Sequence, residues 1–350
     1  SHVKMVQGDT LSLTGDYLKY DGDAQIAQAR KNVHLKHRGT LLVTDSLNYD
    51  KLYDLGYFFD GGKLYDGKNT LVSDWGEYSP QTREAVFNYH VKLTNERFTL
   101  TSDTLHYNTL TKITHIVGPS NINSDGNRIY TERGYYDTAK DYAELFDRSV
   151  VINGKSTMTG DSMYYDKKNG KMHAYNNIVY NDKGNKNLLT GDYCEYDDTT
   201  GYAMATKNAV VRDYSSPDTL FMHADTFKIF TYNIRTDSVY RLVHGYHKAR
   251  AFRSDVQSVC DSLKYDSKNK KMTMYGNPIV WNNNQQLLGE EIQVFMCDST
   301  IDSVHVIRQA LLAQQLDSAC YNQVAGREMY AYFNGGKLSW SKVIGNVDVA

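Results

Sequence analysis

Apolar and polar residues follow one pattern along this chain, and the pattern returns about every 29 residues. An acidic residue marks each copy. Six of these acids are spaced 29 residues apart: Asp16, Asp45, Asp74, Asp103, Glu132 and Asp161. Five more follow at less regular spacings: Asp192, Asp225, Asp261, Glu290 and Glu328. The chain is therefore built almost entirely from copies of one unit.

Within a copy, every second residue after the acid is apolar or aromatic, as Leu18 and Tyr20 are after Asp16. A period of two indicates a β-strand. Three residues before the acid lies another apolar residue, such as Leu13, which a straight strand would point to the opposite face. The small residue before the acid, such as Gly15, favours a β-bulge that inverts the alternation. We therefore predict strands that are bent at the acid.

A second strand follows each short polar turn, as in "GKMHAYNNIVY" from Gly170. It has its own break near the middle, which the sequence places at these residues: Asn32, Gly61, Asn121, Asn177, Asn208, Asn277 and Asn346. Short turns join antiparallel neighbours easily. The predicted fold is an all-β, elongated antiparallel β-jellyroll of about 11 repeats and about 20 bent strands.

One segment tests this prediction, because "SVHVIRQALLAQQLD" from Ser303 has a composition that also suits a helix. Its apolar residues Val304, Ile307 and Leu311 would lie on one helical face. However, "VIRQALLA" from Val306 matches "VIGNVDVA" from Val343 at a spacing of 37 residues. We predict a strand, with a helix as the alternative.

The 350 residues exceed the roughly 250 to 300 at which single cores stop growing, but repeats grow through contacts between neighbours. We therefore predict one repeat-built domain over residues 1–350. Ser1 and His2 suggest the remainder of an expression tag, and the final "IGNVDVA" suggests that the chain stops within a repeat. The net charge of −2, without blocks of like charge, gives no support to a nucleic-acid partner.

The regular acids occupy equivalent positions, so we expect them to bind backbone N–H groups at the bends rather than to act in catalysis. Cysteines lie at Cys194, Cys260, Cys297 and Cys320, without a C-x-x-C motif. We predict no enzymatic activity, no metal and no cofactor, and leave disulfide pairing open. The alternative is a carbohydrate-binding or carbohydrate-active β-solenoid, in which aromatic residues and paired carboxylates form a cleft.

The stretch "GDSMYYDKKNGKMHAYNNIVY", from Gly160 to Tyr180, resembles the repeat of the OstA-like family, and the resemblance extends over all the copies. Members of this family include the periplasmic bridge for lipopolysaccharide transport. The resemblance implies a non-enzymatic protein in the periplasm of a Gram-negative bacterium, with a signal peptide outside the chain given. Such a protein carries lipopolysaccharide toward the outer membrane, with the lipid A acyl chains in an apolar groove between two sheets.

The resemblance also implies which residues line the groove. After the acid these are Leu18, Leu47, Leu105, Met163 and Leu263, and on the second strand Val33, Val91, Ile122, Val150 and Ile178. Implied partners are other β-jellyroll subunits or domains of the transport bridge, joined through edge strands, which present unpaired backbone groups. Whether the two sheets stand apart or close into a core is left open, as is whether the protein is free-standing or part of a longer chain.

Overall fold

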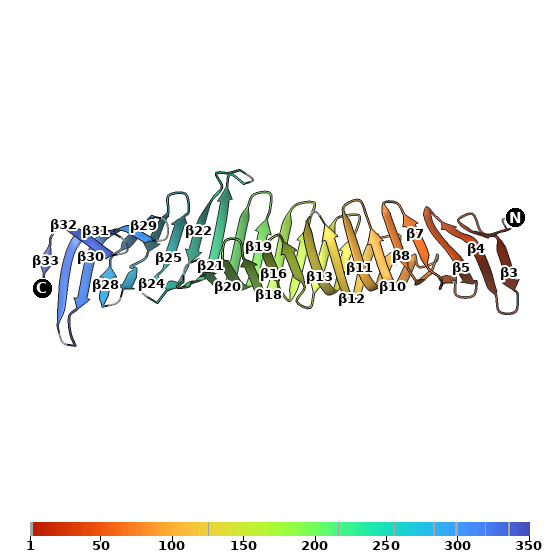
Figure 1. Ribbon diagram of the computed structural model, residues 1–350, viewed down its shortest axis with the longest axis horizontal. Coiled ribbons are helices and arrows are strands. Elements are labelled where there is room, and N and C mark those ends of the chain that lie inside the picture. Colours follow the sequence, from red (N-terminus) through yellow and green to blue (C-terminus); the bar gives the residue numbers. More distant parts are fainter. Residues whose placement is uncertain are drawn as a thin grey trace. The chain divides into compact units, whose positions relative to one another are not determined.

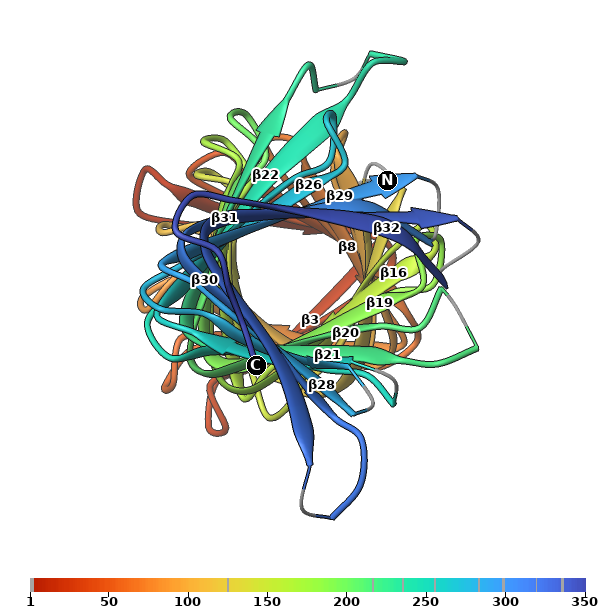
Figure 2. The same ribbon diagram turned by 90° about the vertical axis from the view of Figure 1, so that its left-hand side faces the viewer.

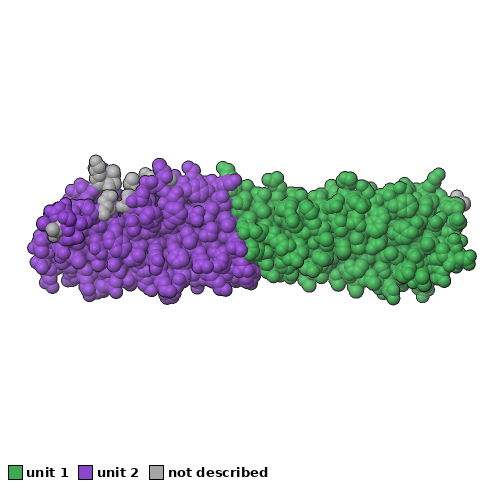
Figure 3. Space-filling view, turned by 90° about the horizontal axis from the view of Figure 1, so that it is seen from below, with its two compact units in different colours: residues 1–169 green, residues 170–350 purple. Residues whose placement is uncertain are grey.

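The computed structural model describes residues 3–124, 126–215, 217–234, 236–254, 256–282, 284–297, 300–318, 320–334 and 337–350. Within these residues it contains 33 β-strands (Figure 1). A helix long and apolar enough to cross a membrane is not found in this described part of the chain. The chain divides into two compact units, residues 1–169 and residues 170–350, which Figure 3 shows in green and purple. We call them unit 1 and unit 2.

Unit 1 contains seventeen strands, which follow one another with short turns. They are β1 (Val3–Gln7), β2 (Leu11–Gly15), β3 (Tyr17–Asp21), β4 (Ile26–His37), β5 (Thr40–Asp50), β6 (Leu55–Phe58), β7 (Gly62–Asp66), β8 (Asn69–Ser73), β9 (Trp75–Tyr78), β10 (Glu84–Thr94), β11 (Phe98–Asn108), β12 (Ile113–Ser124), β13 (Asn127–Asp137), β14 (Tyr142–Phe146), β15 (Val150–Asn153), β16 (Ser156–Thr159) and β17 (Ser162–Asp166).

Unit 2 contains the remaining sixteen strands of the described chain. They are β18 (Lys171–Asp182), β19 (Asn187–Asp197), β20 (Tyr202–Asp213), β21 (Leu220–Tyr232), β22 (Tyr240–Tyr246), β23 (Ala249–Phe252), β24 (Val256–Cys260), β25 (Ser262–Asp266), β26 (Lys271–Tyr275), β27 (Ile279–Asn282), β28 (Gln285–Leu288), β29 (Glu291–Cys297), β30 (Thr300–Gln315), β31 (Tyr321–Asn334), β32 (Lys337–Ile344) and β33 (Asp348–Val349).

Strands within each unit pair antiparallel with their neighbours, and the predicted bends are present. In β4 the pairing with β5 shifts register between Arg30 and Val33, where Lys31 and Asn32 have φ angles of 62° and 51°. In unit 2 the register of β19 with β20 shifts between Thr190 and Tyr193 on β19. Two successive left-handed residues insert a bulge, which inverts the side-chain alternation. The face switch that the sequence required is therefore confirmed.

The break expected at Asn121 is wrong by a few residues. The register of β12 with β13 shifts between Val117 and Ser120, and Gly118 has a φ angle of 100°. A glycine accepts this backbone conformation without the steric penalty that other residues pay. Asn121 instead lies in the regular strand beyond the bend, paired with Tyr130.

The regular acids bind the bends, as the sequence predicted. The side-chain amide of Asn32 donates to Asp16 at 2.7 Å, and the Asn32 backbone N–H donates to Asp45 at 3.1 Å. In unit 2 the Asn208 amide donates to Asp192 at 2.8 Å. At the two left-handed residues the regular ladder of backbone hydrogen bonds is interrupted. The carboxylate of the acid accepts hydrogen bonds from the N–H groups there. Asp16, Asp45 and Asp192 therefore hydrogen-bond the residues that form the bends.

The bend also explains why the structure has more strands than the sequence predicted. Several bent strands are interrupted at the acid, so that β2 ends at Gly15 and β3 begins at Tyr17. The tested segment from Ser303 lies in β30, so the prediction of a strand there is confirmed. That one domain spans residues 1–350 stays a prediction.

Candidate functional site

The candidate site is the inner face of the bent strands, toward which the apolar residues beside the acid point. Figure 2 shows the strands of unit 2 wrapped around an interior. Each bent strand has two arms, one on either side of its bend, as β4 has around Lys31 and Asn32. We call the side that carries the turns the open edge.

Most predicted groove residues lie on this inner face and are buried. Those at 4 % exposure or less are Leu47, Leu105, Met163, Leu263, Val33, Val91, Ile122 and Ile178. Leu18 is only partly buried, but it pairs directly with the fully buried Ala29 and so shares its face. These side chains come together as the sequence predicted, although burial by itself does not make them a lipid site.

Val150 is the exception, since the structure places it on the outer face. It pairs with Tyr130, whose side chain is exposed, while the next residue, Val151, pairs with the buried Ile129 and Met158. Directly paired residues of antiparallel strands share a face. The inner position therefore belongs to Val151, and the prediction for Val150 is wrong by one residue.

The aromatic position four residues after the acid is buried in the middle copies of unit 1. Tyr49, Tyr78, Tyr107 and Tyr136 are buried there, whereas Tyr20 on β3 is exposed and Tyr165 on β17 is partly exposed. In unit 2, Tyr196 has the same place and is 42 % exposed. Cys194 lies two residues before Tyr196 on β19, is buried, and pairs with the buried Ala174 and Ala205. Residues two apart on a strand point to the same face, so Tyr196 lies on the inner face.

The apolar position three residues before the acid shows the same difference. In unit 1 it is occupied by fully buried residues such as Leu42, Leu71 and Leu100. In unit 2 the corresponding Leu189 and Met222 are partly exposed. Residues beside the bend of unit 2 remain buried: Cys194, Phe227, Leu263 and Ile292. Solvent therefore reaches the arms of unit 2 on their inner side, while the bends stay dry.

We call this partly exposed inner surface of unit 2 the trough. Its apolar residues on the arms of β19 to β22 are Leu189, Tyr196, Val211, Met222, Ile229 and Val243. Eleven of the twelve largest fully buried side chains lie in unit 1, and Phe227 is the one in unit 2. The interior of unit 1 is a filled core, whereas the inner arms of unit 2 leave apolar side chains partly exposed.

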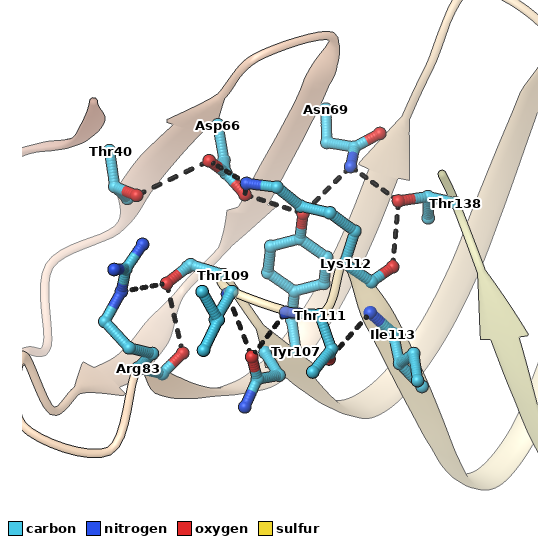
Figure 4. Close-up of polar contacts among 12 residues, drawn as sticks. Thr40, Asp66, Asn69, Arg83, Tyr107, Thr109, Thr111, Lys112, Ile113 and Thr138 are labelled. Carbon is cyan, nitrogen blue, oxygen red and sulfur yellow. Dashed lines mark hydrogen bonds and ion pairs between the residues drawn. The ribbon is translucent and has the colours of Figure 1, made fainter. Parts of the chain in front are cut away.

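Polar side chains close the open edge of unit 1 (Figure 4). The carboxylate of Asp66, at the end of β7, accepts hydrogen bonds from the Tyr107 hydroxyl at 2.7 Å and from the Lys112 ammonium at 2.5 Å. The Asn69 amide donates to the Tyr107 hydroxyl at 2.9 Å and to Thr138 at 2.8 Å. Burial, together with the carboxylate, raises the pKa of Tyr107, so it stays a donor. We call Asp66, Asn69, Tyr107 and Lys112 the Asp66 cluster.

Similar contacts repeat along this edge of unit 1. His37 hydrogen-bonds the Tyr78 hydroxyl at 2.8 Å, and Lys167 donates to Ser124 at 2.6 Å. Arg97 pairs with Asp141 at 3.0 Å, and the Tyr136 hydroxyl also donates to Asp141. Most of them connect residues 41 to 46 positions apart, which belong to different copies.

In unit 2, Asp182, Asp213 and Tyr265 at this edge are half-buried, while Arg241 and Lys270 are exposed. Burial acts to raise the pKa of Asp182, but hydrogen bonds from Asn185 and Gly184 and the charge of Arg241 lower it overall. Burial raises the pKa of Tyr265, and Asp213 adds to that effect while Lys270 opposes it. The same polar design therefore continues into unit 2, around side chains that solvent reaches.

The sequence prediction missed this polar edge, although a signal was present. One polar residue recurs at a spacing of 29 at the end of the second arm: His37, Asp66, Asn95, Ser124, Asn153 and Asp182. Each lies at a strand end and looks like an ordinary turn residue by itself. What could not be predicted is that its partner lies in a copy further along the chain, because that depends on how the arms stack.

Two chemical features bear on catalysis and on the carbohydrate alternative. Burial raises the pKa of the Cys194 thiol to about 12 and that of Cys260 to about 11, so neither forms a thiolate readily near neutral pH. A surface pocket near the bends of β10 to β12 is lined by His90, Val91, Lys92, Thr101, Ser102, Pro119 and Asn121. This lining contains no carboxylate and no Tyr or Trp, unlike the cleft that the alternative requires.

The comparison with family models agrees with the resemblance in part of the chain. The model of the family described as OstA-like protein matches residues 1–103. No curated protein matches the chain. Among solved structures, one match is LptH from Pseudomonas aeruginosa, described as the LptA-homologous periplasmic component of the conserved lipopolysaccharide transport device. It has 15 % identity and a TM-score of 0.28, and the match covers 30 % of this chain and 79 % of LptH.

Proposed function

We propose that this protein binds the acyl chains of lipopolysaccharide in its interior and carries the lipid toward the outer membrane without chemical change. The observation that carries the proposal is the trough of unit 2, an apolar inner surface that solvent reaches. The OstA-like match at residues 1–103 supports the same class of function. By this proposal the protein works in the periplasm of a Gram-negative cell.

The energetics of the trough fit an acyl ligand. Removing apolar surface from water contributes about 0.8 kcal/mol for each buried CH₂ group. An acyl chain on the trough would cover its own methylenes and the partly exposed Leu189, Met222 and Ile229 together. Such binding is proportional to area and non-directional, so a lipid can slide along equivalent copies of the wall. Transport along repeats needs that property.

Partners of the same architecture follow from the proposal. We propose that other β-jellyroll subunits or domains of the transport bridge join through edge strands. Strand β1 is an example of a suitable strand, since all of its side chains except that of Met5 are exposed. Its residues pair antiparallel with β2, from Val3 opposite Gly15 to Gln7 opposite Leu11.

Photocrosslinking from two tyrosines of nearly equal exposure tests the proposal. Tyr196 lies on the inner face at 42 % exposure, and Tyr175 lies on the outer face of β18 at 40 %. Each is replaced separately by p-benzoylphenylalanine, and lipopolysaccharide is added before irradiation. We expect lipid capture from position 196 and little from position 175. Equal capture from both positions, or capture from position 175 alone, would contradict an interior lipid site.

A further inference from the structure

The Asp66 cluster joins two arms of unit 1 that no backbone ladder connects. Among the strand pairs of the described residues, β7 pairs with β5 and β8, and β11 pairs with β10 and β12. Asp66 nevertheless meets Tyr107 and Lys112, which lie 41 and 46 residues further along the chain. These side chains hold the open edge together, so the edge can separate there without breaking the sheet hydrogen bonds.

The cluster covers an apolar interior. Beneath it lie Leu64, Leu105 and the ring of Tyr107, each with 0 % exposure. Asp66 itself is almost fully buried, at 4 % exposure. An acyl chain that approached unit 1 from this side would therefore meet paired polar groups before it met any apolar surface. In unit 2 the inner arms expose apolar side chains such as Leu189 and Met222 in part.

The charges of the cluster make the closure reversible. The Asp66 side chain is 5 % exposed, but the Lys112 side chain is 32 % exposed and already reaches solvent. When such an edge separates, water hydrates both charges, and this hydration offsets part of the lost ion pair. An edge closed by apolar side chains would have no such compensation, because opening it would only expose apolar surface to water. An edge closed by partly hydrated charges is therefore suited to open and close.

We infer that the Asp66 cluster is a latch that determines whether acyl chains can enter the interior of unit 1 from the side. This inference rests on the proposed function, because a latch has meaning only if lipid occupies the interior. With the latch closed, side entry is available in unit 2 and blocked in unit 1. Asp66 is the central residue, since it accepts from Tyr107, from Lys112 and, at 3.4 Å, from Thr40.

The test places a leucine-sized diazirine amino acid at Leu105, beneath the latch, in the full chain. Lipopolysaccharide capture is then measured with the wild-type latch, with Asp66→Ala and with Lys112→Met. Either variant removes the ion pair, and Lys112→Met does so while keeping an apolar stem of similar length. We expect lipid capture at position 105 to be about tenfold higher in both variants than with the wild-type latch. A tenfold rise corresponds to a shift of about 1.4 kcal/mol in the equilibrium between the closed and the open edge. Lys112→Met keeps the test valid if Asp66→Ala fails to fold.

Two controls separate the latch from general loosening. Lys68→Ala removes a cation from an exposed ion pair with Glu96 at the same edge, where the side chains are 70 % and 66 % exposed, and should leave capture at Leu105 unchanged. A p-benzoylphenylalanine at Tyr196 reports lipid binding in unit 2 and should be unaffected by the latch variants. Thermal melts identify any variant that unfolds.

The outcomes distinguish the latch from the proposed function. Capture at Leu105 that rises in the latch variants, with capture at Tyr196 unchanged, supports the latch. The latch is overturned if the probe at position 105 captures as much lipid with the wild-type latch as with the latch variants. It is also overturned if neither latch variant raises capture at position 105 while the probe at position 196 still captures lipid. If the probe at position 196 captures no lipid even with the wild-type latch, the proposed function has failed, and the latch with it.

Discussion

Unit 1 and unit 2 are built from the same repeat, with the same bends and the same antiparallel pairing, yet the inner arms are buried in the middle copies of unit 1 and partly exposed in unit 2. In unit 1, Tyr107 and Leu100 are fully buried, while in unit 2 the equivalent Tyr196 and Leu189 are not. The backbone pattern therefore does not decide how far the inner arms are buried. What differs is the exposure of side chains at equivalent positions.

The two units also differ in where their buried side chains lie. Large side chains such as Phe58 and Phe87 fill unit 1 and are fully buried. In unit 2, burial is concentrated beside the bends, at residues such as Ala205, Ala209 and Phe227. Each strand is stabilised there and by its ladder, so the arms can remain uncovered. A repeat architecture permits this because every copy is held by its neighbours.

Truncating the same position in the two units should give the largest contrast. Leu100→Ala in unit 1 removes a fully buried side chain and leaves a cavity, so we expect a loss of about 2 to 5 kcal/mol. Leu189→Ala in unit 2 removes a side chain that is already partly in water, so we expect about 1 kcal/mol or less. Native-state hydrogen exchange of β11 and β19 measures each effect locally. Equal losses would remove the distinction between core and trough.

Removing the hydroxyl from the aromatic position should give a smaller contrast. Tyr107→Phe deletes the donor to the buried Asp66 carboxylate and the acceptor for Asn69, which should cost about 1 to 3 kcal/mol. Tyr265→Phe, at the equivalent place in unit 2, should cost less than about 1 kcal/mol because that side chain is half-buried. Urea unfolding monitored by hydrogen exchange compares the two. A larger loss for Tyr265→Phe would reverse the expected order.

The smallest effect is a pH dependence of unit 1. Burial lowers the pKa of His37 below its usual 6.5, with Arg83 and Arg38 contributing. The unfolded chain therefore binds a proton more readily, and stability is lost as the pH falls from 6.5 toward the lowered pKa. Thermal melts between pH 7.5 and about 5.5 should show this loss. His37→Gln should reduce it.

The matched control for this pH dependence is His34→Gln. His34 lies on the same strand, and its ring nitrogen contacts the Asn32 carbonyl at 3.0 Å rather than a buried hydroxyl. This substitution should leave the slope of stability against pH as it is in the wild type. If both variants changed the slope equally, the burial of His37 at the open edge would not be its cause.

The sequence predicted the repeat, the bends and most inner residues because these depend on local alternation. Leu47, Leu105 and Met163 follow directly from their offset to the acid. Val150 was misplaced because its copy has the bend at Asp147 and Arg148, whose φ angles are both 57°, and the following alternation puts Ser149 and Val151 inside. A one-residue shift of a bulge reverses every side chain beyond it.

The openness of the trough and the Asp66 cluster could not be predicted in the same way. Both depend on contacts between copies, such as that between Asp66 and Tyr107, which are 41 residues apart. Leu100 and Leu189 have the same offset from their acids, and nothing in that offset indicates that one is buried and the other partly exposed. The period alone therefore does not make this distinction.

Thiol labelling at two matched positions tests the central claim most directly. In a chain whose four native cysteines are replaced by serine, Leu100→Cys and Leu189→Cys are treated separately with a maleimide, with and without lipopolysaccharide. The account predicts that the thiol at position 189 reacts quickly and is protected by the lipid, while the thiol at position 100 reacts slowly in both conditions. Equal reaction at the two positions, or no protection at position 189, would contradict it.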